Sequence, residues 1–410
     1  MSSTPTPGWL RVLIAVLLVD MLGAGLYLPV SLLYFTKVAD LPLSTVGWCL
    51  SFAQLATLPL PLLIGRLVDR VGARTVVLGG LVLQGVGFLG YLWVGSPGSL
   101  VVFALLAALG QRAYWSSIFT LIAELASGPE RDRAYGIAGA AQNTGVGLGA
   151  VLAALLLAVG DESAYQVAVV VNAATFLLSA LVLWRGLPKT KAAPAPKAQG
   201  LGVGPLRDKP FVALVGANTV FALCSGMLAL GLPVFMADAL AGPGWLVAVL
   251  LGANTAALAL CQVWVVKRTE GRRRTRVLFV AAVLWTGWGV LMASTLGLPT
   301  VAVLPFLLLV TAPYTLAELL HAPTSNALAA AAAPAEQRGS YLATFQFSFA
   351  LAGAIGPALF TQLFGWHPAA PWLVIAAASL LAGLAMIALE RRLPALAVRT
   401  RAAEEELASA

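Results

Sequence analysis

Long apolar runs alternate with short polar or charged segments along the whole chain. Twelve runs are long enough to cross the hydrocarbon core of a bilayer, which takes about 20 helical residues. The pattern therefore predicts an all-α integral membrane protein with twelve transmembrane helices in two six-helix bundles. The predicted spans are Leu10–Phe35, Ser44–Ile64, Thr75–Trp93, Leu100–Leu121, Tyr135–Val159, Tyr165–Leu183, Phe211–Phe235, Trp245–Val266, Val277–Leu296, Val301–His321, Gly339–Leu363 and Pro371–Leu389.

The composition excludes a soluble protein of 410 residues. Hydrophobic residues make up 60% of the chain and charged residues only 10%, against about 25% in soluble domains. The first apolar run is too long for the core of a signal peptide and lacks a convincing cleavage site. We therefore expect it to remain as the first helix.

The formal net charge of +8 at first suggests a nucleic-acid partner. However, 23 of the 25 Lys and Arg residues fall on the side of the predicted topology that both termini share, whereas Lys37 faces the other side and Arg112 lies inside a span. Positive residues stay in the cytoplasm, so both termini are expected there, with the protein in the inner (plasma) membrane. The basic charge then reflects topology and contact with anionic lipids at the cytoplasmic face, with no nucleic-acid partner.

Cysteine and histidine usage argues against metal or disulfide chemistry. Cys49, Cys224 and Cys261 all fall within predicted spans without metal-ligand spacing, so we expect small buried hydrophobic residues. Only two histidines are present, which excludes a histidine-rich metal site. The chain also lacks a nucleophile–base constellation and a sizeable extramembrane domain, so we expect neither an enzyme nor a cofactor.

Three charged residues lie deep within predicted spans, away from the span ends: Asp20 in the first, Arg112 about halfway along the fourth, and Glu318 in the tenth. An ionisable group inside a membrane is costly unless it faces a cavity or a partner, which makes all three candidates for proton coupling, with Glu318 as a cation or proton site in the second half. The structural alternative pairs Arg112 with Asp20 or Glu318 to hold helices together.

Further polar and aromatic side chains in the spans are candidates for lining a substrate cavity. The structural alternatives are hydrogen bonds between helices and anchoring at the membrane interface. For His321, predicted near the cytoplasmic end of its span, simple solvation is a further alternative. The candidates are Tyr27, Tyr114, Trp115, Asn143, Asn218, Tyr314, His321 and Gln346.

The segment from Gly65 to Arg74 is expected to form a short charged loop between the second and third spans. Asp69 would end one helix, and Arg70 and Arg74 would begin the next. The order of Gly65, Asp69, Arg70, Gly72 and Arg74 resembles the signature loop of the major facilitator superfamily. A degenerate copy that lacks the acidic position occurs at Lys267–Arg276.

The second half of the chain repeats the first. Residues 334–338 (PAEQR) match residues 129–133 (PERDR) at an offset of 205, and a Lys-, Pro- and Ala-rich segment lies midway. The predicted organisation is a six-helix bundle in residues 1–184, a cytoplasmic linker in 185–210, a second bundle in 211–390, and a cytoplasmic tail in 391–410.

Closely spaced glycines mark the fifth span at Gly145, Gly147 and Gly149. They allow a neighbouring helix to approach or the helix itself to bend. Their position resembles the antiporter motif of the same superfamily, although its proline is missing. In the eleventh span, Gly356 and Pro357 supply a break of the kind absent from the fifth.

The resemblance implies a transporter that works by alternating access, most like the drug:proton antiporter branch. It implies that Asp69 stabilises the outward-facing state through the start of the eleventh helix, and that Arg112 takes part in proton coupling. Burial favours a protonated Asp20 and a nearby Arg112 favours its carboxylate, so a contact made in one conformation alone would load and release a proton.

Two acidic groups against one arginine, with Trp115, Tyr114 and Tyr314 as an aromatic wall, suit an amphipathic or cationic substrate. We expect a monomer that uses the proton gradient as its energy source. The alternative function is a uniporter, symporter or exporter for a sugar, amino acid or other small metabolite.

Overall fold

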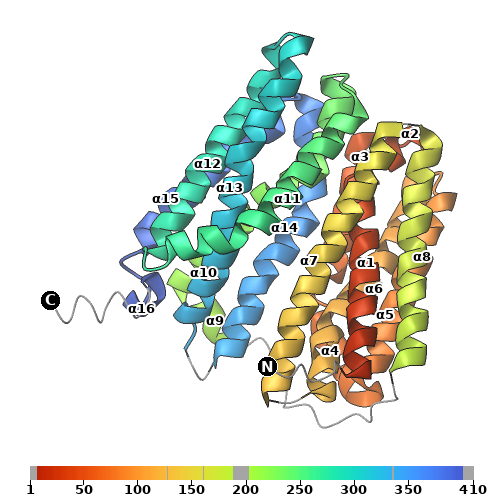
Figure 1. Ribbon diagram of the computed structural model, residues 1–410, viewed down its shortest axis with the longest axis vertical. Helices are drawn as coiled ribbons and strands as arrows, with labels where there is room; N and C mark the ends of the chain where they lie inside the picture. The colour runs from red at the N-terminus through yellow and green to blue at the C-terminus, as the bar shows by residue number, and fades with distance from the viewer. Residues whose placement is uncertain (1–6, 127, 160, 188–202, 335–336, 400–410) are drawn as a thin grey trace. The chain divides into compact units, whose positions relative to one another are not determined.

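A computed structural model describes residues 7–126, 128–159, 161–187, 203–334 and 337–399 (Figure 1). All regular secondary structure in these ranges is helical, which confirms the predicted fold class. The helices of the first half are α1 (Gly8–Tyr27), α2 (Ser31–Lys37), α3 (Leu43–Thr57), α4 (Pro61–Val71), α5 (Ala73–Gly90), η1 (Tyr91–Trp93), α6 (Pro97–Leu125), α7 (Gly128–Val159) and α8 (Glu162–Gly186). Those of the second half are α9 (Val203–Arg207), α10 (Lys209–Val234), η2 (Phe235–Ala239), α11 (Gly244–Thr269), α12 (Arg274–Ser294), η3 (Thr295–Gly297), α13 (Thr300–Ala332), α14 (Arg338–Trp366), α15 (Ala370–Leu389) and α16 (Ala395–Val398).

Eleven helices in the described ranges are long and apolar enough to span a membrane. The exception is the predicted second span, Ser44–Ile64, which the structure divides into α3 and α4 around a turn at residues 58–60. Pro59 and Pro61 explain the interruption, because proline cannot donate a backbone hydrogen bond to the preceding turn. A similar turn at residues 28–30, which contains Pro29, separates α1 from α2 within the predicted first span.

The chain divides into two compact units. Unit 1 comprises residues 1–198 and 242–252, and unit 2 comprises residues 199–241 and 253–410. The first residues of α11 thus group with unit 1 and the rest with unit 2. Residues 188–202 of the predicted linker lie outside the described residues.

Glycines allow close helix packing in the core of unit 1, where α1 contacts α7 and α8, and α5 contacts α6 and α8. A Cβ atom on Gly145 would lie 2.6 Å from the backbone oxygen of Leu18, and the backbones at Gly149 and Gly25 approach the partner helix more closely still. Because α7 continues as a helix from Gly128 to Val159, these glycines serve close approach between α1 and α7 in this conformation.

Aromatic side chains dominate the core of unit 2, where α12 packs between α13 and α15, and α10 contacts α14 and α15. Trp285, Trp288 and Trp372 are fully buried, and the Trp288 and Trp372 rings meet edge to face at 5.4 Å. The helix α14 runs without a break from Arg338 to Trp366, through Pro357. The break expected at Gly356 and Pro357 is therefore absent in this conformation.

The junction between α4 and α5 is much shorter than the predicted loop. Residues from Gly65 to Val71 continue α4, and Gly72 alone separates it from α5. Gly72 has a φ angle of 85°, a conformation that side chains with a Cβ rarely adopt. Gly271, between α11 and α12, has a φ of 73°, so the degenerate copy in the second half repeats the left-handed glycine.

Candidate functional site

Asp20 is buried in the core of unit 1. Its side chain on α1 is 1% exposed, and neither carboxyl oxygen has a hydrogen-bond partner among the described residues. The Tyr114 hydroxyl on α6 lies near enough to interact with this carboxyl, but the two groups do not have hydrogen-bond geometry. The hydroxyl has no other hydrogen-bond partner within the described residues. A buried carboxyl without a hydrogen bond is costly, which marks this position as a candidate functional site.

Asn172 is a second unsatisfied polar group near Asp20, and the sequence analysis did not identify it. It lies on α8, is fully buried, and neither atom of its side-chain amide is hydrogen-bonded within the described residues. A Cβ on Gly23 of α1 would lie 2.7 Å from its Oδ1, so the amide contacts α1 about one turn from Asp20. An amide within an otherwise apolar span was the signal that could have identified it.

Arg112 is held by an amide rather than by a carboxylate. Its Nη2 atom donates to Oε1 of Gln54 on α3 at 3.2 Å, and Gln54 Nε2 donates to Gln111 Oε1 at 3.1 Å. The described residues contain no ion pair between Arg112 and Asp20 in this conformation. Gln54 was not among the predicted site residues.

The predicted aromatic residues of unit 1 differ in exposure. Tyr27 is buried beside Phe88 and Tyr91, and its hydroxyl has no hydrogen-bond partner in the described part of the chain. Tyr114 is also buried, whereas Trp115 is 36% exposed. Asn143 lies on α7, but its side chain is outside the described residues.

Glu318 on α13 lies in a hydrogen-bonded network within unit 2. Its Oε1 accepts from the Ser225 hydroxyl at 2.6 Å, and its Oε2 accepts from Asn254 Nδ2 at 3.0 Å. The hydroxyl of Thr315 donates in turn to Asn254 Oδ1 at 2.6 Å. Glu318 thus differs from Asp20, because α10 and α11 both supply it with donors.

His321 is buried among aromatic rings, which contradicts the solvated alternative. Its ring packs edge to face against Phe221 and Trp285, and its Nε2 lies 2.9 Å from Asn218 Oδ1. Asn218 Nδ2 also donates to the Ser348 hydroxyl at 2.7 Å. The solvated alternative was wrong because α13 continues beyond His321 to Ala332, through an alanine-rich segment that favours helix.

The two remaining candidates of unit 2 have different environments. Tyr314 is buried, and its hydroxyl donates to the backbone oxygen of Ser225. Gln346 is exposed on α14, and its amide lies 3.4 Å from Asn326 Oδ1.

The charged residues around Gly72 occupy different positions from those predicted. Asp69 and Arg70 are both exposed in the last turn of α4, so Arg70 ends one helix rather than beginning the next. Arg74 is buried, and its Nη2 donates to the backbone oxygen of Trp184 at 2.6 Å, near the end of α8. Gly65 is helical and has open space around it, so the turn depends on Gly72 alone.

The three cysteines are all free thiols. Cys49 and Cys224 are buried, as expected, but Cys261 is exposed on α11. Apolar side chains beside it are exposed too, among them Leu260 and Val263. The expectation of a buried residue was wrong for Cys261 because hydropathy alone does not distinguish the exposed face of an apolar helix from its buried face.

The sequence comparison shows the family. The sequence profile of the Major Facilitator Superfamily matches residues 13–357. The multidrug resistance protein MdtH of Edwardsiella ictaluri is 28% identical over 76% of this chain and 75% of its own length. The MdtH protein of Aeromonas hydrophila is 26% identical over 93% of this chain and 95% of its own.

Solved transporter structures share the fold. The nucleoside transporter NupG superposes with a TM-score of 0.78 at 14% identity, covering 93% of this chain and 98% of that chain. The peptide transporter POT in complex with sulfate gives a TM-score of 0.73 at 16% identity, with 96% of each chain covered. At these identities the likeness concerns the fold alone.

Proposed function

The chain belongs to the Major Facilitator Superfamily and is therefore a multi-pass membrane transporter of small molecules, and we propose that it exports amphipathic or cationic compounds in exchange for protons. Relatives named multidrug resistance proteins, which align over most of this chain, support this substrate class. The proposal places the protein in the inner membrane as a monomer with both termini in the cytoplasm. The proton gradient supplies the energy without a cofactor.

The observation that carries the proposal is the environment of Asp20. Its carboxyl is buried without a hydrogen bond or an ion pair within the described residues. In such surroundings the neutral, protonated acid is much cheaper than the carboxylate, so access to water or to a cation would control release of the proton. A group of this kind can couple proton movement to a change of conformation.

Arg112 is the cation that would drive this release. In the present conformation its guanidinium binds the Gln54 amide, a neutral partner that it can exchange at modest cost. Movement of α6 relative to α1 would bring Arg112 to Asp20 and stabilise the carboxylate, and it would break the hydrogen bond between Arg112 and Gln54. On the reverse step this hydrogen bond would form again and Asp20 would lose its cation. The proton is thereby taken up in one state and released in the other.

Glu318 has a different role in this proposal. Donors from Ser225 and Asn254 satisfy its two carboxyl oxygens, so its carboxylate is less costly than that of Asp20, which has no such donors. We therefore assign Glu318 to attraction of a cationic substrate and Asp20 to the proton. The exposed Trp115 supplies an aromatic face on which such a cation can bind.

Asp20→Asn tests the coupling. Purified protein would be reconstituted into liposomes that contain a pH-sensitive dye, a pH gradient imposed, and a panel of lipophilic cations added. We expect wild-type protein to move protons when substrate is added, and Asp20→Asn to lose this movement because an amide cannot be protonated in the same range.

Asp161→Asn is the matched control. Asp161 precedes α8 outside the predicted membrane core and accepts a hydrogen bond from the Ala164 backbone at 2.8 Å, which together with the Ser163 hydroxyl lowers the pKa of its carboxyl. Asparagine caps a helix as well as aspartate, so coupling should remain normal. Full substrate-dependent proton movement in Asp20→Asn would exclude Asp20 as the coupling residue.

A further inference from the structure

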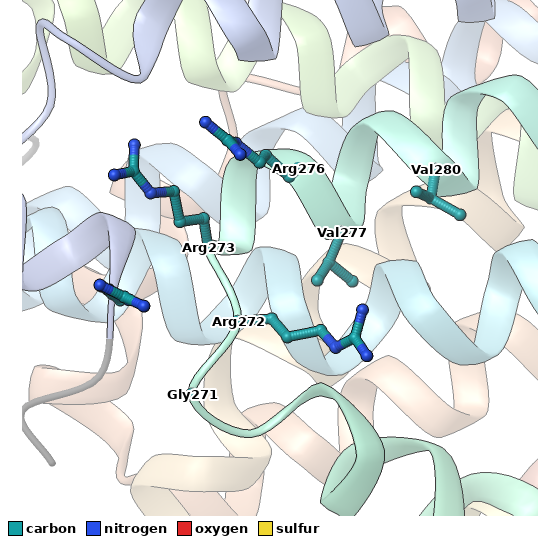
Figure 2. Close-up of a pocket in the computed structure, with 7 residues that line it drawn as sticks. Gly271, Arg272, Arg273, Arg276, Val277 and Val280 are labelled. Carbon is teal, nitrogen blue, oxygen red and sulfur yellow. The ribbon is translucent and has the colours of Figure 1, made fainter. Parts of the chain in front are cut away.

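A cavity of about 340 Å³ lies at the beginning of α12, within unit 2 (Figure 2). Four arginines line it: Arg272, Arg273 and Arg276 around the start of the helix, and Arg399 after α16. Val277 and Val280 complete its wall on the α12 side. The cavity is thus cationic at one end and apolar at the other.

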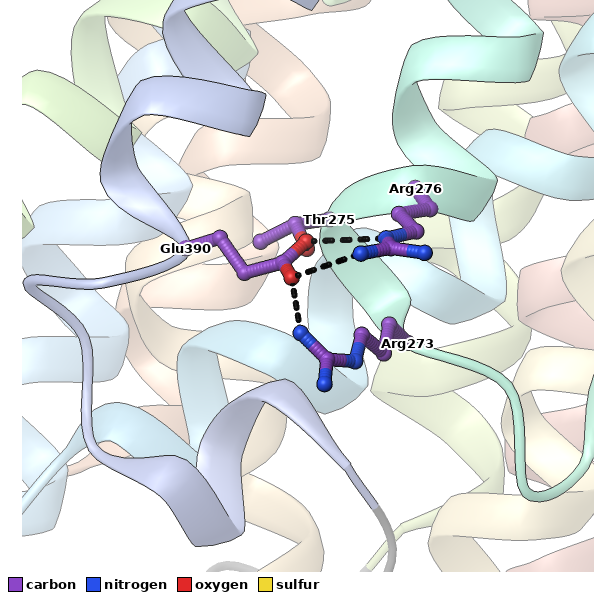
Figure 3. A network of polar contacts seen from close by, with 4 residues as sticks. All are labelled: Arg273, Thr275, Arg276 and Glu390. Carbon is purple, nitrogen blue, oxygen red and sulfur yellow. Dashed lines mark hydrogen bonds and ion pairs between the residues drawn. The ribbon is translucent and has the colours of Figure 1, made fainter.

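One carboxylate partly neutralises this cluster. Glu390 forms an ion pair with Arg273 and a longer one with Arg276 at 3.4 Å, and it accepts a hydrogen bond from the Thr275 hydroxyl at 2.8 Å (Figure 3). Of the four guanidinium groups, those of Arg273 and Arg276 therefore have a carboxylate partner.

Arg272 and Arg399 remain without a counter-ion. The side chains of both lack an ion pair and a hydrogen bond within the described residues, and the Nε atom of Arg399 is buried without a partner. A buried guanidinium nitrogen without an acceptor is costly, and an external anion at this position would satisfy it.

The position of Arg399 is fixed by the fold. Arg274 Nη1 donates to the backbone oxygen of Ala397 at 2.7 Å, and the side chains of Ala397 and Val398 are buried against unit 2. These contacts hold α16 beside the start of α12, so that two segments more than 100 residues apart in sequence contribute to one cavity.

The apolar side of the cavity leads onto the membrane-spanning part of α12. Val280 is exposed, and Val283 and Val290 continue the same exposed face at helical spacing. Arginines at the end of a span followed by an apolar ridge match a molecule with an anionic head and a hydrocarbon tail. A small soluble anion would bind the arginines but would leave these valines without an apolar contact.

We propose that this cavity binds the phosphodiester headgroup of an anionic phospholipid, with Arg272 and Arg399 as its ligands and one acyl chain along Val280 and Val283. The proposal does not depend on the substrate or on proton coupling. It commits to a lipid of the bilayer as the occupant, rather than to a free phosphate.

The test compares two double variants of the full chain. Arg272→Gln/Arg399→Gln removes the two cations without a counter-ion, and Arg391→Gln/Arg392→Gln removes two exposed charges from the neighbouring tail outside the cavity. Native mass spectrometry of protein in detergent would follow titration with phosphatidylglycerol or with phosphatidylethanolamine of the same acyl chains. A lysine version, Arg272→Lys/Arg399→Lys, keeps the charge.

We expect the glutamine variant in the cavity to bind phosphatidylglycerol about 30-fold more weakly than wild type, because each arginine near an anionic lipid contributes roughly a five-fold factor. The lysine version should retain most of the affinity, and the tail control should change it by less than about two-fold. Since neither arginine side chain forms a hydrogen bond or an ion pair within the described residues, gel filtration should show all variants to be folded.

Three results would overturn the proposal. Equal weakening in the tail control would mean that surface charge, and not the cavity, binds the lipid. Equal binding of phosphatidylethanolamine would exclude recognition of an anionic head, and displacement of the lipid by millimolar inorganic phosphate would identify a site for a free anion.

Discussion

Gly145→Ala tests whether close contact between α1 and α7 stabilises unit 1. The added Cβ atom would lie 2.6 Å from the Leu18 backbone oxygen and 2.8 Å from the Met21 Cβ. Ordinary contact begins at about 3.4 Å, so the two helices would have to separate by about 0.8 Å. A backbone oxygen within a helix cannot turn aside as a long side chain can, so the separation must be taken by the helices themselves.

Overpacking of this kind costs about 1–3 kcal/mol. Alanine also favours helix over glycine by about 0.8–1.0 kcal/mol, which acts in the opposite direction. Gly139→Ala isolates that second effect, because Gly139 lies on the same helix and has open space around it. The difference between the two variants therefore measures the steric cost alone.

The measurement is the apparent melting temperature in detergent, followed by fluorescence-detected gel filtration. For a steric cost of about 2 kcal/mol, Gly145→Ala should melt about 6 °C below Gly139→Ala, since a domain of this size shifts by about 3 °C per kcal/mol. Equal melting temperatures would refute the argument, because they would show that the α1–α7 interface can relax at no cost.

Two further predictions concern the ends of helices. Gly72→Ala should destabilise the protein by about 1–3 kcal/mol, because glycine tolerates the positive φ angle at the α4–α5 junction far better than other residues do. Gly79→Ala should not destabilise it, because Gly79 has open space around it on α5. Equal melting temperatures for the two variants would contradict this prediction. Glu390 provides a prediction of pH dependence. Partial burial acts to raise the pKa of its carboxyl, but hydrogen bonds from Thr275 and two arginines outweigh this and leave the pKa below its usual value of 4.5. A lowered folded-state pKa stabilises the fold above the unfolded value, and this stabilisation is lost as pH falls through the folded value. The melting temperature of wild type should therefore be higher than that of Glu390→Gln at pH 7, and this difference should disappear on acidification below pH 4. A difference in melting temperature that does not change with pH would contradict the reasoning.

Hydropathy predicted the spanning helices well because each must bury its backbone polar groups in lipid. It could not predict where a helix ends beyond the membrane. The charged residues Arg66 and Asp69 indicated a loop, yet they continue α4 as far as Val71, since charged residues form helices readily in water. Proline had the opposite effect at Pro59, where an apolar run that appears continuous is interrupted.

The candidate site was predictable in its members but not in their partners. Asp20 and Arg112 stand out as charges within apolar spans, but the rotation of each helix decides which groups face each other. The sequence therefore suggested an Asp20–Arg112 pair, whereas in this conformation Arg112 binds Gln54. Asn172 was missed because a single amide in a span is usually a helix-to-helix contact, and only its lack of partners distinguishes it.

The one-residue junction at Gly72 has a consequence for the evolution of chain length. An α-helix turns by about 100° per residue, so one inserted residue that joined α5 would rotate every later side chain of that helix by this amount. Gly87 now allows the α6 backbone to approach, with an imagined Cβ only 2.6 Å from the Ala107 nitrogen, and the insertion would place Val86 at this position. We therefore expect this junction to be intolerant of insertions and deletions. In related chains, the number of residues between Gly72 and the glycines of α5 should stay the same.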